Sequence, residues 1–456
     1  MASGERMIHR EHLQARSYSG VWTIICLLAA LPAFTNVKLG SLQPEDFVLL
    51  VLVGICIADF LYSGLSFRLL PELKDLSKSY GLLVVSLFLL TILDLRMKFY
   101  PLENASLLKQ PLILPFIRLL QFASMLYGFL WLTRVFITKK GLLAQAMNVY
   151  WRIGIMSSLY ATLSCFAVKA LHVTPSPDSI FGAYLPDGQM RARGFFVEGG
   201  PFGLYLVSVL VVGLLRRYMT GRRLGMGNMV ILFVAFFLSG SKAGFLAGTL
   251  LTIYSGISAA SFHRKVLYLL LVTSILAGAA VWMNLGDSLL GYATSIQNVE
   301  LNADMVGNDP NIVLGRIAAL YIVPRMIAAH PVTGIGIGNY PLVRNDPDYL
   351  GQLPAITDLE DQPGLGIPGI AAEFGIPATL WLLVLLFRPY WQGRKKASIL
   401  VISALFQPLA HAVGVQLTFF YPWFVSACAL AASIGEERQT AARSADLDHL
   451  EAGVIR

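Results

Sequence analysis

Charged side chains are scarce in this sequence. Asp, Glu, Lys and Arg make up 14% of its 456 residues, whereas 56% are hydrophobic and the mean hydropathy is +0.64. Soluble domains carry about a quarter charged residues. Long apolar runs fill the chain instead, and at roughly 20 residues per transmembrane helix they supply about twelve spans. The composition therefore excludes an ordinary soluble domain and predicts an integral membrane protein with the lipid bilayer as its partner.

Cysteine is also scarce, and its placement is informative. The four cysteines all fall inside apolar runs: Cys26, Cys56, Cys165 and Cys428. A disulfide framework is therefore not expected, and the sequence has no Cys/His spacing typical of a metal site. The N-terminal stretch is polar and long before the first apolar run, so we expect no cleaved signal peptide.

The net charge of +8 is concentrated in short loops, which argues against a nucleic-acid partner. Basic residues mark the N-terminus, every second loop and the C-terminal tail. They are Arg6, Arg10, Arg16, Arg68, Lys74, Lys78, Lys139, Lys140, Arg216, Arg217, Arg222, Arg223, His263, Arg264, Lys265, Arg388, Arg394, Lys395, Lys396, Arg438 and Arg443. The positive-inside rule places these segments, and hence both termini, in the cytoplasm.

The predicted fold is all-α, a polytopic transmembrane bundle of about twelve spans with a long periplasmic loop containing surface helices. The expected spans are 21–34, 47–65, 80–95, 112–137, 153–171, 196–215, 229–238, 245–259, 266–282, 367–387, 397–413 and 417–434. The expected order is a cytoplasmic N-terminus (1–18), transmembrane helices 1–9 (19–285), the periplasmic loop (286–366), transmembrane helices 10–12 (367–434) and a cytoplasmic tail (435–456). Within the loop, residues 312–329 mix isoleucine and leucine with arginine, which indicates a half-buried surface helix.

Several cations are expected on the opposite, outer face, against the positive-inside bias. They are Arg191, Arg193, Lys242, Arg316, Arg325 and His330. The planar guanidinium forks of Arg191 and Arg193 suit a phosphate, although both could instead anchor a helix at lipid headgroups. Lys242 lies in a sharp corner between two spans, where it could bind diphosphate or extend to the headgroups.

Glu198 and His330 are the candidates for acid–base chemistry. Glu198 lies one or two turns into an apolar span, which makes it a functional candidate by default; a salt bridge to Arg191 or Arg193 is the alternative. His330 precedes a proline, so it either ends the surface helix or acts in catalysis. Asp346 and Asp348 have a metal-like spacing, for which Mg²⁺ or Ca²⁺ would be the suitable ions, but such pairs are common in loops.

Four motifs, in order, resemble the O-antigen ligase and polysaccharide polymerase superfamily of bacterial inner membranes. They are RARGFFVEGGPFGLY at 191–205, SKAG at 241–244, HPVTGIGIGNY at 330–340 and EFGIP at 373–377. Two positions depart from the family pattern. Lys242 replaces the arginine of the corner motif, and Gly364 stands where ligases usually carry a histidine. The lysine keeps the charge but loses the planar fork, and the missing histidine favours an exopolysaccharide or O-antigen polymerase over a lipid A core ligase.

The resemblance implies transfer of a glycan from an undecaprenyl-diphosphate-linked oligosaccharide to a hydroxyl of a second lipid-linked glycan, at the periplasmic face of the inner membrane. It implies no cofactor, nucleotide sugar or metal. Arg191, Arg193, Lys242 and Arg316 would bind the diphosphate leaving group, and Glu198 or His330 would accept the hydroxyl proton. A flippase and a chain-length regulator of the same pathway are candidate partners.

Two alternatives remain open from the sequence. An O-antigen-type ligase would move a finished glycan onto a lipid or protein acceptor. A transporter or flippase for the lipid-linked glycan would instead need ionisable residues at mid-membrane depth, where these spans carry almost none.

Overall fold

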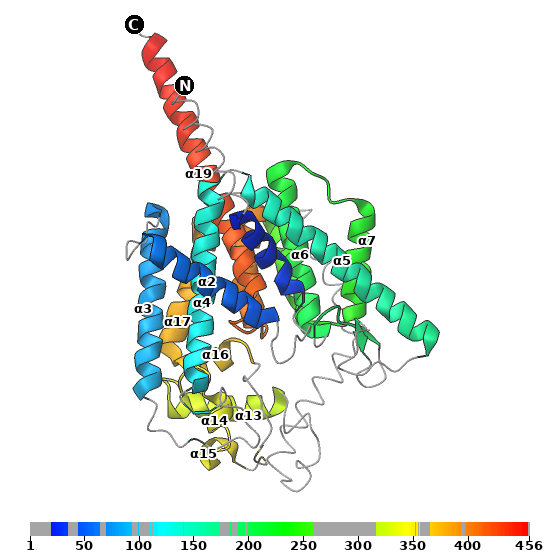
Figure 1. The fold of residues 1–456 in the computed structure, drawn as a ribbon, viewed down its shortest axis with the longest axis vertical. Coiled ribbons are helices and arrows are strands. Elements are labelled where there is room, and N and C mark those ends of the chain that lie inside the picture. The colour runs from blue at the N-terminus through cyan, green and yellow to red at the C-terminus, as the bar shows by residue number, and fades with distance from the viewer. Residues whose placement is uncertain are drawn as a thin grey trace, which may run out of the picture.

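Helices account for most of the structure, a computed structural model shown in Figure 1. It describes residues 20–34, 44–63, 70–93, 99, 110–111, 113–139, 141–172, 182–184, 190–196, 199–259, 316–351, 353, 355, 365–393 and 397–454. The predicted span 266–282 and most of the N-terminus lie outside these residues.

The bundle is built from antiparallel helices that follow the apolar runs of the sequence. After an apolar helical segment, Gly20–Ala33, the helices are α2 (Pro44–Ser63), α3 (Pro71–Leu93), α4 (Ile113–Thr138), α5 (Leu142–Leu171), α6 (Gly199–Thr220), α7 (Met226–Ser239), α8 (Lys242–Ala259), α17 (Ile376–Gly393), α18 (Ser398–Ala412) and α19 (Phe420–Val454). Four of the described helices, α3 to α6, are long and apolar enough to cross a membrane. Together with the other apolar helices, they indicate a membrane protein.

The remaining helices form a small unit at one end of the bundle. They are α13 (Arg316–Ala329), α14 (Tyr340–Val343), α15 (Pro347–Leu350) and α16 (Ile367–Phe374). Figure 1 shows α13, α14 and α15, which we call the loop helices, beyond the lower ends of α3 and α4. We call this the loop end of the bundle and the opposite one the tail end, because α19 extends past it. Helices α4, α6, α8, α17 and α19 begin at the loop end, and α3, α5, α7 and α18 finish there.

Two hydrophobic cores stabilise these two units. The large core runs through the bundle, where Trp151, Trp423 and Phe424 are almost fully buried. The second core joins the loop helices to α16 through residues such as Ile322, Tyr340 and Ala372. Because Ala372 belongs to α16, this second core fixes the loop helices on the helix that leads into α17.

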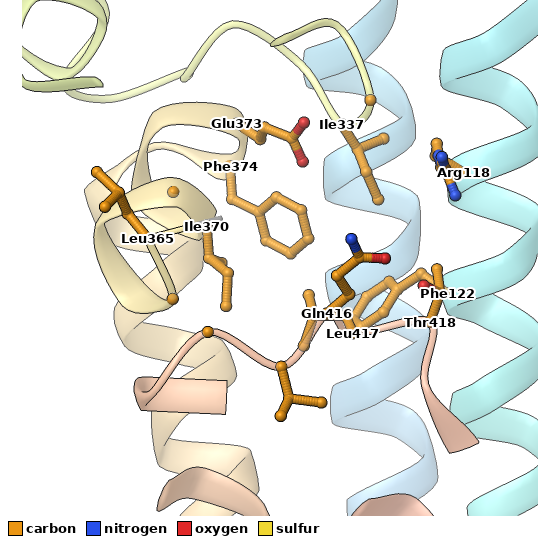
Figure 2. A pocket seen from close by; sticks show the side chains of 15 residues that line it. Arg118, Phe122, Ile337, Leu365, Ile370, Glu373, Phe374, Gln416, Leu417 and Thr418 are labelled. Carbon is orange, nitrogen blue, oxygen red and sulfur yellow. The ribbon is translucent and has the colours of Figure 1, made fainter. Parts of the chain in front are cut away.

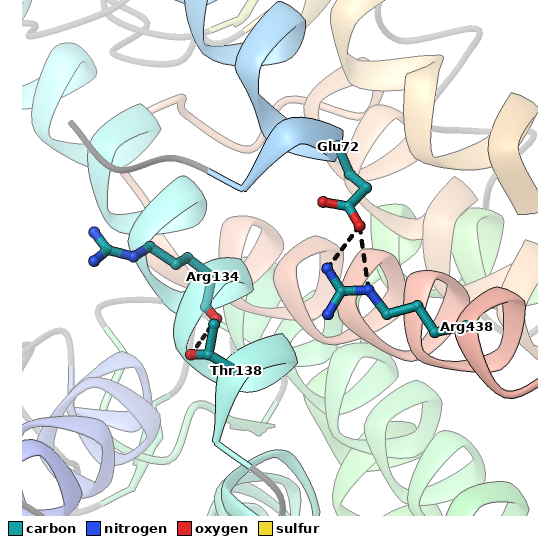
Figure 3. Close-up of polar contacts among 4 residues, drawn as sticks. All are labelled: Glu72, Arg134, Thr138 and Arg438. Atoms are coloured by element: carbon teal, nitrogen blue, oxygen red, sulfur yellow. Dashed lines mark hydrogen bonds and ion pairs between the residues drawn. The ribbon is translucent and has the colours of Figure 1, made fainter. Parts of the chain in front are cut away.

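At the tail end of the bundle, an ion pair connects two parts of the chain that are far apart in the sequence. The Arg438 guanidinium of α19 donates to Glu72 Oε1 of α3 at 2.6 Å from Nη2 and 3.1 Å from Nε (Figure 3). Nearby, the Thr138 hydroxyl donates back to the Arg134 carbonyl at 2.8 Å near the end of α4. The contact between Glu72 and Arg438 places the start of α3 and the tail at the same end, as the alternation of loops predicted.

The mostly helical fold agrees with the predicted all-α class; the described residues add a two-residue antiparallel ladder in which Ala183–Tyr184 (β1) pairs with Arg191–Ala192 (β2). Some of the predicted spans need correction. The span predicted at 367–387 is broken, because Gly375 has φ +76° and separates α16 from α17. The spans predicted at 80–95 and 153–171 begin much earlier, at Pro71 and Leu142. In both cases the helix also includes a polar or mixed stretch that precedes the apolar run.

Candidate functional site

A tight corner between α7 and α8 positions the first group of predicted cations. Ser241, which is 2% exposed, donates its hydroxyl to the Gly200 carbonyl at 2.7 Å and accepts from the Gly244 amide at 3.0 Å. A Cβ on Gly203 would lie 2.2 Å from the Ser241 Cβ, so only glycine permits this approach of α6 to the corner. The small residues of the motifs at 191–205 and 241–244 therefore allow the start of α6 to pack directly against the start of α8.

This corner brings Arg191 and Lys242 to the same place. The Arg191 stem passes Gly240, since a Cβ built there would lie 3.5 Å from Arg191 Cδ and Nε. Lys242 is the first residue of α8 and is half-buried. We call Ser239–Lys242, together with Arg191, the cationic corner. Two of the four predicted diphosphate ligands thus meet at the loop end of the bundle.

Arg193 lies close to this corner but is buried in the protein. Its side chain is 1% exposed, and its amide donates to the Gly182 carbonyl at 2.8 Å, next to the β1–β2 ladder. The neighbouring Phe195 stacks on Tyr160 of α5 at 4.3 Å between ring centroids. A side chain this deeply buried is less open to a ligand than that of Arg191, which is half-buried.

An apolar cavity of ≈ 310 Å³ runs into the bundle directly beside the cationic corner. Helices α6, α7 and α8 line it with Leu206, Val207, Leu210, Leu232, Phe233, Phe236, Phe237, Phe245, Gly248, Thr249 and Thr252. The corner and the cavity share backbone hydrogen bonds, because the Gly240 amide donates to Phe237 and the Phe245 amide donates to Ser241. The cavity wall therefore begins within one helical turn of the cationic corner.

His330 lies in a different part of the loop end. Its amide donates to the Met326 carbonyl at 2.9 Å, so it closes the last turn of α13, as the helix-stop interpretation predicted. Its Nε2 is 2.8 Å from the Tyr349 hydroxyl of α15. Burial lowers the pKa of His330 below its usual value, which favours the neutral ring at pH 7. A neutral imidazole could accept a proton, and its pairing with Tyr349 fixes its orientation.

The glycine-rich segment after His330 attaches the loop helices to the α16–α17 junction. The amides of Ile335 and Gly336 donate to the carbonyls of Ala372 and Glu373 at 2.8 and 3.0 Å, and Ile376 donates to Pro331 at 2.8 Å. A Cβ on Gly334, which has φ +68°, would lie 2.4 Å from the Glu373 carbonyl. The glycines thus allow two backbones to meet, as the sequence predicted for a close approach.

A pocket lined by two charged side chains among mostly apolar ones lies beneath this attachment, between α4, α16 and the α18–α19 connection (Figure 2). It is lined by Arg118, Phe122, Ile337, Gly338, Leu365, Gly366, Gly369, Ile370, Glu373, Phe374, Gly414, Val415, Gln416, Leu417 and Thr418. The backbone N–H groups of Gly338 and Tyr340 bond to the Glu373 carboxylate. Burial nevertheless raises the pKa of Glu373 to about 7, although these bonds and the Arg118 charge oppose the shift.

Neither charged residue of this pocket is a site candidate from the sequence. Glu373 belongs to a family motif only, and Arg118 lies within the apolar run 112–137. A signal for Arg118 did exist, because a charged side chain inside a membrane span is a functional candidate by default. No sequence pattern indicated that α4 and α16 would bring the two residues to one pocket.

The other predicted site residues have separate outcomes. Glu198 lies outside the described residues, and of Arg316 the structure describes the backbone at the start of α13 but not the side chain. Arg325, expected to face outward, donates to the Tyr321 carbonyl at 2.8 Å and lies 3.4 Å from the centre of that ring. Asp346 caps α15 by accepting from the Asp348 amide at 3.0 Å, which gives the Asp-x-Asp spacing a structural role.

Comparison with known proteins agrees with the motifs. Residues 227–383 match the family model described as O-antigen ligase, a range that contains Lys242, His330 and Glu373. A search of curated proteins finds no match. The family match confirms the predicted resemblance: residues 227–383 are similar to the O-antigen ligase family, which supports the O-antigen ligase and polysaccharide polymerase superfamily.

Proposed function

We propose that this protein is a polysaccharide polymerase. It transfers glycan from an undecaprenyl-diphosphate-linked donor to a second lipid-linked glycan at the periplasmic face of the inner membrane, with both termini in the cytoplasm. The observation that carries the proposal is the junction of the cationic corner with the apolar cavity of α6, α7 and α8. A lipid-linked diphosphate has the same two parts, an anionic head and a long apolar chain.

The dimensions of the junction suit such a donor. From Phe245 to Thr252 the cavity wall follows α8 for about 10 Å, at roughly 1.5 Å per residue, away from the corner. An isoprenoid chain lying there would leave its diphosphate between Arg191 and Lys242. These cations would stabilise the negative charge that develops on the leaving diphosphate as the glycosidic bond breaks. In this proposal the reaction needs neither a nucleotide sugar nor a metal ion.

Substitutions at the corner test this role. A hydrogen bond to a charged group contributes about 1.5–3 kcal/mol, so one lost contact slows transfer roughly 10- to 100-fold. We therefore expect Arg191→Ala and Lys242→Ala each to slow chain growth by that factor at normal protein levels. Arg222→Ala is the matched control, because Arg222 is an exposed cation between α6 and α7 at the tail end. Unchanged chain length in both corner variants would refute the assignment.

Reconstitution separates the proposed activity from its alternatives. Purified protein in liposomes that contain the lipid-linked repeat unit should lengthen the glycan if it is a polymerase. A ligase would pass an intact glycan to a different acceptor, and a flippase would only move the substrate between leaflets. Gly364, which stands where ligases usually carry histidine, favours the polymerase.

A further inference from the structure

We propose that the pocket between Arg118 and Glu373 holds the acceptor hydroxyl and that Glu373 accepts its proton. This inference rests on the proposed function, to which it adds the second substrate site and the base. It departs from the sequence analysis, in which Glu198 or His330 was the candidate base.

Some buried polar atoms of the pocket lining lack hydrogen-bond partners within the described part of the chain. Glu373 Oε1, at the end of α16, and Thr418 Oγ1, in the connection between α18 and α19, are in this position. Buried polar atoms are almost always paired, so two such atoms facing one pocket indicate a missing partner. The hydroxyl groups of a sugar can donate to a carboxylate and accept from a threonine, so a sugar edge in the pocket supplies partners of the right kind for both atoms.

The local structure holds Glu373 ready for this role. The N–H groups of Gly338 and Tyr340 bond to its carboxylate, which fixes the side chain against the glycine-rich segment. In the view of Figure 2, the Ile337 side chain is drawn between the Glu373 carboxylate and the Arg118 side chain. A carboxyl group with a pKa of about 7 is divided between its two protonation states at neutral pH, as a general base requires.

Gly338 allows α4 to contribute to the same pocket. A Cβ on Gly338 would lie 2.6 Å from Arg118 Cγ, and its φ of +74° favours glycine as well. The glycine-rich segment can therefore lie directly on the Arg118 stem. From that position the arginine charge lowers the pKa of Glu373 and partly offsets the effect of burial.

The size of the pocket limits what it can hold. Its cavity measures ≈ 50 Å³, which admits a few water-sized groups. The pocket can therefore take one hydroxyl-bearing edge of a sugar, while the rest of the acceptor lies outside. Arg118 and Glu373 are its titratable lining side chains. His411 of α18 is not part of the pocket lining, and its ring bonds through Nδ1 to the Val415 carbonyl at 3.0 Å.

The proton and electron balance of the step is simple. The acceptor oxygen forms a bond to the anomeric carbon of the donor as its proton passes to the Glu373 carboxylate. The bond between that carbon and the diphosphate oxygen breaks, and the electron pair leaves with the polyprenyl diphosphate. Glu373 then releases the proton to water, which restores the carboxylate for the next transfer.

The decisive variant is Glu373→Gln, measured as initial elongation rate against pH in liposomes. Glutamine keeps an oxygen for the Gly338 and Tyr340 amides but cannot take the proton. We expect the rate to fall about 10²- to 10⁴-fold, which is the usual contribution of a general base. The wild-type rate should rise with pH through about 7 as Glu373 ionises, and Glu373→Gln should lack this rise. A rate within about threefold of wild type, or an unchanged pH profile, would overturn the inference.

A second pair of variants tests the same point without altering Glu373. Arg118→Gln removes a charge that lowers the pKa of Glu373, so the rise in rate should move to higher pH; Arg118→Lys should leave it in place. His330→Gln should keep the rise if Glu373 is its source. If Arg118→Gln and Arg118→Lys show the same midpoint, the assignment is wrong. A wild-type protein that transfers no glycan would refute the proposed function itself, which distinguishes the two failures.

Discussion

Gly334→Ala is the sharpest test of how the loop helices are attached to the bundle. The new Cβ would lie 2.4 Å from the Glu373 carbonyl oxygen and 2.5 Å from the Gly375 nitrogen, and both atoms belong to backbone that cannot rotate away. A non-glycine residue at φ +68° adds about 1–2 kcal/mol of strain. If the segment shifts, the bonds from Ile335 to Ala372 and from Gly336 to Glu373 are lost, at about 0.5–1.5 kcal/mol each. Together these effects predict a destabilisation of about 2–5 kcal/mol.

The assay must separate this attachment from the stability of the whole bundle. Hydrogen exchange monitored by mass spectrometry in detergent should show faster exchange at the Ile335 and Gly336 amides in Gly334→Ala, while the amides of α6 stay protected. Gly81→Ala is the matched control, because a Cβ on Gly81 in α3 would meet nothing within 4 Å. It should be neutral or slightly stabilising. If Gly334→Ala exchanges at the wild-type rate at both amides, the backbone contact does not hold the loop helices.

The remaining predictions concern three other contacts. Burial lowers the pKa of His330, so the folded state disfavours its protonation. The stability of the protein should therefore fall as the pH drops below about 6.5. In thermal unfolding scans, His330→Gln should reduce this pH dependence. Ser241→Ala leaves the Gly244 amide without its acceptor and should destabilise by about 1–3 kcal/mol, whereas an unchanged melting temperature would contradict the packing of the cationic corner. Arg438→Ala breaks an exposed ion pair with Glu72 and should change stability by less than about 1 kcal/mol at 0.15 M salt; a larger loss would show a wider structural role.

The sequence predicted the helices of the bundle well where apolar runs were long. The spans expected at 112–137 and 229–238 match α4 and α7 to within a few residues, because a membrane helix must satisfy its backbone internally and cover it with apolar side chains. It was wrong about the run 367–387, where an uninterrupted apolar pattern concealed the break at Gly375. That break depends on a carbonyl of another segment, since a Cβ on Gly375 would lie 2.1 Å from the Val332 oxygen.

The residues of the candidate site were likewise predicted from the sequence only in part. The positive-inside alternation indicated the outer-face cations, Arg191 and Lys242 among them, and the structure places the Arg191 stem beside Gly240, two residues before Lys242. The prediction that His330 ends a helix was also confirmed. The roles of Glu198 and Arg316 stay predictions. The pocket of Arg118 and Glu373 could not be predicted, because its two charged residues are separated by 255 positions and meet only when α16 packs beside α4.

By itself, the sequence determined that this chain is a helical membrane protein and which superfamily motifs it carries, because hydropathy and motif order are local properties. Tertiary structure alone decided which polar groups share a pocket and which of them lack a partner. Those properties depend on long-range contacts through glycines such as Gly334, Gly338 and Gly375, whose missing side chains let backbones meet. Burial then sets the chemistry of Glu373, because removing a carboxyl group from water raises its pKa toward neutrality.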